Sequence, residues 1–116
     1  MAVQNASQVW SSKRVATTTW SALLNGNQGS AESPGRLSDR SIQVTGTFGA
    51  AGSVQIEGSN DGATWFILRD PQGANLTFTA AGLKEILENT QFVRPNVTAG
   101  DGTTSLNVVL TSASTA

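Results

Sequence analysis

Side chains that commonly perform catalysis are scarce in this sequence. It contains no His and no Cys, so the commonest general base, the commonest transition-metal ligand and the thiol nucleophile are all missing. A conventional catalytic triad and a structural zinc site are therefore not expected. The eight Asp and Glu residues are scattered, and no spacing marks an acid–base pair, although folding could bring two of them together. We expect no enzyme, no catalytic residue, no metal site and no cofactor.

Two short segments with Asp followed by Gly deserve a separate test, because calcium-binding loops also contain this pair. They are Asn60-Asp61-Gly62 and Asp101-Gly102. A calcium loop needs alternating oxygen ligands and a distant Glu, and neither segment has them. Gly accepts the positive φ angle that a tight connection requires, so both segments are predicted to be turns.

The composition indicates a β-rich domain without a strong electric field. Charged residues make up 13 % of the chain, about half the usual fraction, and the net charge is −1. Such a chain offers no electrostatic footprint for nucleic acid or an anionic membrane. No signal peptide and no apolar run of membrane-spanning length is visible, so we expect a soluble protein made in the cytoplasm.

The segment Ser53–Arg69 reads as a β-hairpin around which the rest of the chain is organised. Val54 and Ile56 alternate with polar residues, which is typical of a half-buried strand, and Asn60–Gly62 supplies the turn. The returning segment Trp65–Leu68 is apolar at four consecutive positions. Because successive side chains of a strand point to opposite faces, both faces of this segment need a cover: the fold itself, a helix, a loop or another subunit.

Two registers of this hairpin are compatible with the sequence. A three-residue loop pairs Ile56 with Phe66, and a four-residue loop pairs Ile56 with Ile67 and sets Gly58 opposite Trp65. In either register we expect Trp65 to be buried within the chain.

The remaining segments complete an all-β pattern. Predicted strands cover residues 15–24 (with Trp20 in the core), 41–48, 75–79, 91–98 and 105–112. One short helix is predicted near residues 82–89, because Leu83, Ile86 and Leu87 fall at i, i+3 and i+4. With about seven or eight short strands, the predicted fold is an antiparallel β-sandwich. Its domain spans residues 15–112, preceded by an N-terminal arm or edge strand (1–14) and followed by a short tail (113–116).

Two neighbouring residues of the 91–98 strand raise separate questions. Pro95 cannot donate a ladder hydrogen bond, so the strand is expected to lie at an edge or to break there. Arg94 shares a face with Phe92, so it either snorkels to solvent or pairs with a carboxylate such as Glu88.

Candidate partner contacts come from two segments. In the N-terminal segment, Val9 and Trp10 either dock as an edge strand or belong to an arm that orders against a partner, with Trp10 as its anchor. Residues 25–40 form a long polar stretch, read either as a mobile surface loop or as a partner-contact loop. The candidate contact residues are Trp10, Lys13, Arg14, Arg36, Leu37 and Arg40.

The segment Glu57–Val108 resembles small virion proteins of tailed bacteriophages. The similar pieces are GSNDGATW, DPQG, LTFTAAG and VRPNVTAGDGTTSL. Proteins of this size in phage structural operons are often capsid decoration (cement) proteins. The resemblance implies a β-rich structural protein at the capsid surface of the virion, made in the host cytoplasm. Its partners would be the major capsid protein and further copies of itself, with no nucleic acid and no membrane.

Two alternatives stay open beside the decoration protein. The piece SNDGATW is also similar to the SxDGxxW hairpin of discoidin-like carbohydrate-binding modules, which implies a glycan-binding domain. A head–tail or tail accessory protein shares the phage resemblance and differs only in its location on the particle.

Overall fold

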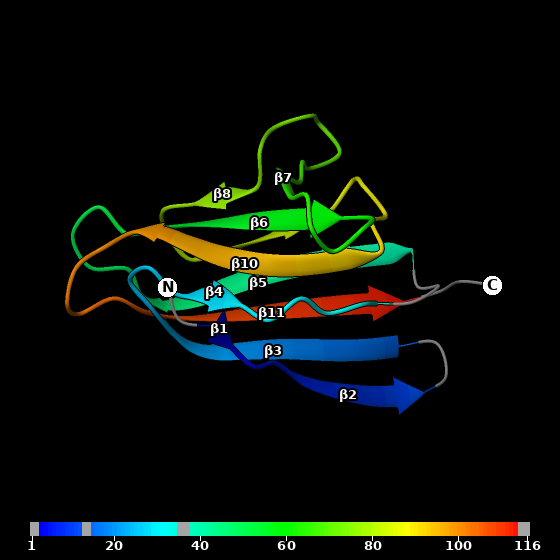
Figure 1. Cartoon of the computed structure of the whole chain (residues 1–116), viewed down its shortest axis with the longest axis horizontal. Helices are drawn as coiled ribbons and strands as arrows, with labels where there is room; N and C mark the ends of the chain where they lie inside the picture. The colour runs from blue at the N-terminus through cyan, green and yellow to red at the C-terminus, as the bar shows by residue number, and fades with distance from the viewer. Residues whose placement is uncertain (1–2, 13–14, 35–37, 114–116) are drawn as a thin grey trace.

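The computed structural model describes residues 3–12, 15–34 and 38–113, and these form two β-sheets packed face to face (Figure 1). The strands are β1 (Val3–Gln4), β2 (Ser7–Ser12), β3 (Val15–Leu24), β4 (Gln28–Gly29), β5 (Asp39–Thr47), β6 (Ser53–Ser59), β7 (Phe66–Ile67), β8 (Thr77–Phe78), β9 (Gly82–Glu85), β10 (Phe92–Ala99) and β11 (Ser105–Ala113).

The first sheet has the strand order β1-β4-β10-β6-β7, and β8 also pairs with β6. The second has the order β2-β3-β11-β5-β9. All of the pairings are antiparallel except that of β1 with β4. The all-β, two-layer architecture agrees with the predicted sandwich. The predicted strands at 15–24, 41–48 and 105–112 appear as β3, β5 and β11 with small changes of boundary.

The core lies between the two sheets and follows the period-two pattern of the long strands. Val44, Val54, Ile56 and Leu110 are completely buried, as expected for alternating apolar residues on facing sheets. Trp20 on β3 is also completely buried, and its indole Nε1 donates a 3.0 Å hydrogen bond to the carbonyl oxygen of Ser30. The ring therefore has its one polar atom satisfied inside an apolar environment.

The predicted helix near residues 82–89 is wrong. The described residues contain no helix, and Gly82–Glu85 is strand β9, paired with β5 in the register Leu83 to Gln43. Of the three apolar residues that suggested a helix, Ile86 is buried, whereas Leu83 and Leu87 are 65 % and 47 % exposed. A three-residue pattern is too short to stabilise a helix, and the free edge of β5 offers backbone hydrogen bonds instead.

Neither predicted register of the central hairpin is observed. Gly58 lies opposite Phe66 and Glu57 opposite Ile67, so six residues (60–65) connect the two strands. The loop is longer than expected because its side chains bond to its own backbone, as described below. Leu68 is buried, but Phe66 is 69 % exposed, so the fold covers one part of this apolar segment and not the other.

Pro95 lies in the interior of its sheet, contrary to the expectation of an edge or a break. Strand β10 continues through it, with Pro95 opposite Ile56 of β6. The amide groups of Val93 and Val97 on either side donate to Glu32 and Asn27, on the side where β4 lies. Successive amides of a strand point to opposite sides, so the N–H that Pro95 lacks would also have pointed toward β4. The ring of Pro95 packs on Gly29 there. A Cβ on Gly29 would lie 2.5 Å from the proline ring, so a residue without a side chain is required there.

Candidate functional site

The loop between β6 and β7 is held by the side chains of Ser59 and Asp61. The Asp61 Oδ1 atom accepts hydrogen bonds from the amides of Ala63 and Thr64, each 2.8 Å long, and from the Ser59 hydroxyl at 2.9 Å. The amide of Gly62 donates to Ser59 Oγ at 2.9 Å, and Gly62 has a φ of 78°. The predicted turn at Asn60–Gly62 is therefore confirmed, as part of a self-bonded six-residue loop.

These hydrogen bonds also fix the ionisation of Asp61. The amide of Thr64, then that of Ala63, then the Ser59 hydroxyl stabilise the carboxylate and lower its pKa to about 2. Asp101, in the second predicted turn, behaves in the same way. Hydrogen bonds from the Thr103 side chain and from the Ala50 amide lower its pKa to about 2. Both carboxylates thus stabilise turns. Within the described ranges, no three Asp or Glu side chains gather as a metal site would require.

An open cleft with a volume of about 470 Å³ lies beside this loop. One wall is apolar and consists of Phe66, Ile67 and Leu68 from the β7 segment. The polar residues around it come from the end of β6, from the loop, and from the segment that precedes β10. They are Ser59, Asn60, Asp61, Thr64, Glu88 and Thr90. A mostly exposed aromatic ring next to an ionised carboxylate can hold an apolar or cationic side chain.

Hydrogen bonds to neighbouring segments hold both walls of the cleft in place. The amide of Gln91 donates to Asn60 Oδ1 at 3.1 Å, which holds the loop. Across the cleft, Glu88 accepts hydrogen bonds from Arg69, at 2.8 Å from its amide and 2.7 Å from its Nε atom. Burial acts to raise the pKa of Glu88, but these bonds from Arg69 outweigh it and leave the pKa lowered. The cleft is thus formed before any partner arrives.

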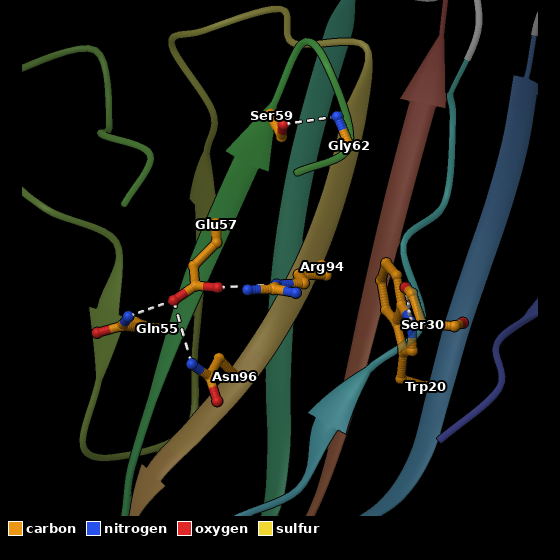
Figure 2. Close-up of polar contacts among 8 residues, drawn as sticks. All are labelled: Trp20, Ser30, Gln55, Glu57, Ser59, Gly62, Arg94 and Asn96. Atoms are coloured by element: carbon orange, nitrogen blue, oxygen red, sulfur yellow. Dashed lines mark hydrogen bonds and ion pairs between the residues drawn. The ribbon is translucent and has the colours of Figure 1, made fainter. Parts of the chain in front are cut away.

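A polar cluster on the outer face of the first sheet supports the same hairpin (Figure 2). Glu57 on β6 accepts a 2.9 Å hydrogen bond from Arg94 Nε and a 3.2 Å bond from Asn96 Nδ2, both on β10, and a further bond from Gln55. The Arg94 guanidinium lies 3.9 Å from the centre of the Trp65 ring. Arg94 does pair with a carboxylate, as one alternative held, but the partner is Glu57 and not Glu88.

Trp65 is half-buried rather than enclosed in the core. Its ring stacks on Arg94, outside the space between the sheets. The SxDGxxW spacing therefore has a local structural purpose, in which Ser59 and Asp61 shape the loop and Trp65 anchors its far end on β10. The sequence pattern pointed to a turn and a buried ring, and only the pairing with Arg94 shows where the ring packs.

The structure does not gather the six predicted contact residues at one place. Trp10 lies on β2 and is 49 % exposed, so it is available at the surface. Arg40 is only 4 % exposed; its Nη1 atom donates to the carbonyl oxygen of Thr90 at 2.9 Å, and burial lowers its pKa. Arg40 thus supports the far wall of the cleft and is not a surface contact. Lys13, Arg14, Arg36 and Leu37 lie outside the described residues.

Most of the large exposed apolar side chains lie on edge strands, but Leu24 ends the inner strand β3 and Leu87 follows β9. Phe66 is the most exposed of the large ones at 69 %, and sequence reasoning flagged its segment without predicting a cleft. The others that are large and exposed are Val3, Val9, Trp10, Leu24, Leu83 and Leu87. No helix in the part of the chain that the structure describes is long and apolar enough to cross a membrane.

The fold has relatives among solved structures, although no protein-family model and no curated protein matches the sequence. The chain is similar to YomS, a protein derived from the SPBc2 prophage, with a TM-score of 0.66 and 10 % sequence identity. That match covers 91 % of this chain and all of YomS, so the two proteins share a fold over their whole domains.

A second solved structure, the BH2720 protein of Bacillus halodurans, matches less closely. Its TM-score is 0.49 at 15 % identity, and the match covers 96 % of this chain and 71 % of that protein.

Proposed function

We propose that this chain is a non-enzymatic structural protein of a tailed-phage virion that binds and reinforces the capsid surface, as a decoration protein. The observation that carries the proposal is the preformed cleft beside Phe66, an aromatic side chain that the fold leaves 69 % exposed. Large exposed aromatic groups in preformed concave sites are typical of protein interfaces. The shared fold with a prophage-derived protein supports the phage setting.

The charged residues support a protein partner over a nucleic acid. Arg94 pairs with Glu57 and Arg69 with Glu88, so these two cations are neutralised within the chain. Asp61 and Asp101 bond to their own turns. Charged residues make up only 13 % of the chain, and a surface with so few charges is cheap to desolvate, which favours protein contact. Many identical copies around a head would also add weak contacts by multivalency.

Co-sedimentation tests the proposal directly. Purified protein is mixed with capsids assembled without it and separated on a density gradient, with detached tails in a parallel tube. We expect the protein to travel with the capsids and not with the tails. Phe66→Glu should lower retention at least tenfold, because it places a charge at the cleft. Leu24→Glu changes a 50 % exposed residue at the end of β3 and serves as the matched control.

The alternatives predict different outcomes. Retention on tails but not on capsids would point to a tail accessory protein. Binding to a glycan array without capsid binding would point to the carbohydrate-binding module. In that module the aromatic ring of the SxDGxxW piece would have to be free for a sugar, whereas Trp65 has Arg94 against its ring. Either outcome would overturn the decoration role.

A further inference from the structure

The outer edge of strand β2 is the longest free sheet edge among the described strands. The edge strands β1, β7 and β8 have two residues each and β9 has four, whereas β2 has six. Its pairing with β3 is regular from Ser7 to Trp10 and shifts only after Trp10. Along such an edge, backbone N–H and C=O groups point outward in a row, and the partner that satisfies a row of them is another extended strand.

Strand β2 lacks the features that usually prevent such pairing. Its sequence, SQVWSS, contains no charged residue, no Pro and no Gly. The opposite edge of the same sheet, β9, is shorter and carries Lys84 and Glu85. Charged side chains on an edge strand are the common protection against pairing with another chain. The two edges of this sheet therefore differ, and β2 is the unprotected one.

The side chains of β2 add apolar surface on both faces of that edge. Trp10 is in register with Ala16, which is buried, so Trp10 lies on the core-facing side of the sheet. It is nevertheless 49 % exposed, because β2 is the outermost strand of its sheet and projects past the other sheet (Figure 1). Val9 is in register with Thr17 on the other side and is 60 % exposed.

We propose that β2 pairs with β2 of a second copy of this chain, antiparallel about a two-fold axis normal to the sheet. Such an axis keeps the core-facing sides of both copies on the same side, so opposing residues must share a face. The register that sets Val9 opposite Val9 of the second copy meets this condition and brings Gln8 next to the partner's Trp10. Because β2 carries no charged side chain, the pairing of two copies brings no like charges opposite each other. The two five-stranded sheets then form one continuous sheet.

This inference goes beyond the proposed function and does not depend on it, because a decoration protein can attach to a capsid with or without contact between its copies. Sedimentation velocity of the isolated protein separates the two ideas because no capsid is present. The unmodified chain has a mass of 12.0 kDa and should sediment at about twice that mass at micromolar concentration. Val9→Lys should return it to the monomer mass. Leu83→Lys, which places the same charge on exposed β9, should leave the dimer unchanged.

A cysteine pair gives an independent readout, because the chain has no natural Cys. Directly opposed residues of antiparallel strands have Cβ atoms about 4.5–5.5 Å apart, which small movements bring into disulfide range. Under mild oxidation Val9→Cys should form a covalent dimer and Leu83→Cys should not. A monomeric unmodified protein, or dimers unaffected by Val9→Lys, would overturn the pairing. If that monomer still co-sedimented with capsids, the decoration role would stand without it.

Discussion

Trp20 and Trp10 lie on adjacent strands and on the same side of one sheet, yet the first is completely buried and the second is half exposed. The difference is the opposing sheet, which covers β3 around Trp20 and does not reach β2. Burial in this sandwich is thus decided by how far the two layers overlap and not by residue type or strand position alone. The uncovered margin is where apolar side chains remain free for partners.

The largest effect that tests this contrast is expected for Trp20→Ala. The substitution removes a large ring from a closed core and leaves a cavity, so we expect a loss of about 3–5 kcal/mol in the free energy of unfolding. A loss of this size is a large fraction of the stability of an ordinary domain. Urea unfolding followed by circular dichroism measures it. A loss below about 1 kcal/mol would show that the overlap region is less tightly packed than described.

The two Arg–Glu pairs test the same contrast between buried and exposed positions, now with charged side chains. Arg94→Met leaves the Glu57 carboxylate, with its side chain 8 % exposed, without its cation, and should cost about 3 kcal/mol. Arg69→Met breaks a pair whose side chains are 52 % and 27 % exposed, and should cost about 1 kcal/mol or less. Both variants are compared in the same urea experiment. Equal losses would contradict the difference in burial.

Trp65→Ala should have an intermediate effect, because this ring is half-buried and packs on Arg94 outside the core. We expect a loss of about 1–2 kcal/mol, from the cation–π contact and part of the ring's apolar area. Trp65→Phe keeps an aromatic face and should recover much of the loss. A loss as large as that of Trp20→Ala would instead mean that the loop end belongs to the core.

A smaller effect depends on pH and concerns the two turns that Asp61 and Asp101 stabilise through hydrogen bonds. The pKa values of Asp61 and Asp101 are about 2 in the folded chain, below the ordinary value of 3.8. The unfolded chain binds more protons between those values, so the stabilisation is present above pH 4 and is lost as the pH falls toward 2. Asp61→Asn keeps an acceptor oxygen but no charge, so its melting temperature should fall less steeply over this range. The additional change Asp101→Asn should flatten the dependence further, and an unaltered slope in both would contradict the assignment.

Trp10→Ala is expected to have the smallest effect on the fold and a large effect on association. The ring is half exposed at the sheet margin, so the free energy of unfolding at dilute, monomeric concentration should change by about 0.5 kcal/mol or less. The dimer proposed above should weaken markedly in sedimentation. A large loss of stability in the monomer would mean that Trp10 packs in the core as Trp20 does, which would contradict the difference in their burial.

The long strands were predictable because apolar residues alternate with other residues where one face of a strand is buried. Leu106, Val108 and Leu110 alternate with less buried residues, and all three are completely buried on β11. The predicted turn at Asn60–Gly62 also appears, with the amide of Gly62 donating to Ser59 Oγ at 2.9 Å. Period and turn chemistry are local properties, so a single sequence contains them.

The errors arose where distant contacts decide the structure. The residues near Leu83 follow the free edge of β5, and nothing local to them reveals that edge. Arg40 is a charged residue in a polar segment, and its burial depends on a carbonyl group fifty residues later, at Thr90. The cleft beside Phe66 likewise joins two loops that are separate in sequence. Its segment could be flagged as needing a cover, but the cover itself is a tertiary property.

The position of β11 determines when this domain can fold during synthesis. The strand lies between β3 and β5 at the centre of its sheet and pairs along its length with both (Figure 1). Until residues 105–113 have left the ribosome, β3 and β5 have no common neighbour and that sheet cannot close. The nascent chain therefore carries β3 and β5 without the strand that joins them until β11 has been made, and unpaired strand edges of this kind favour aggregation.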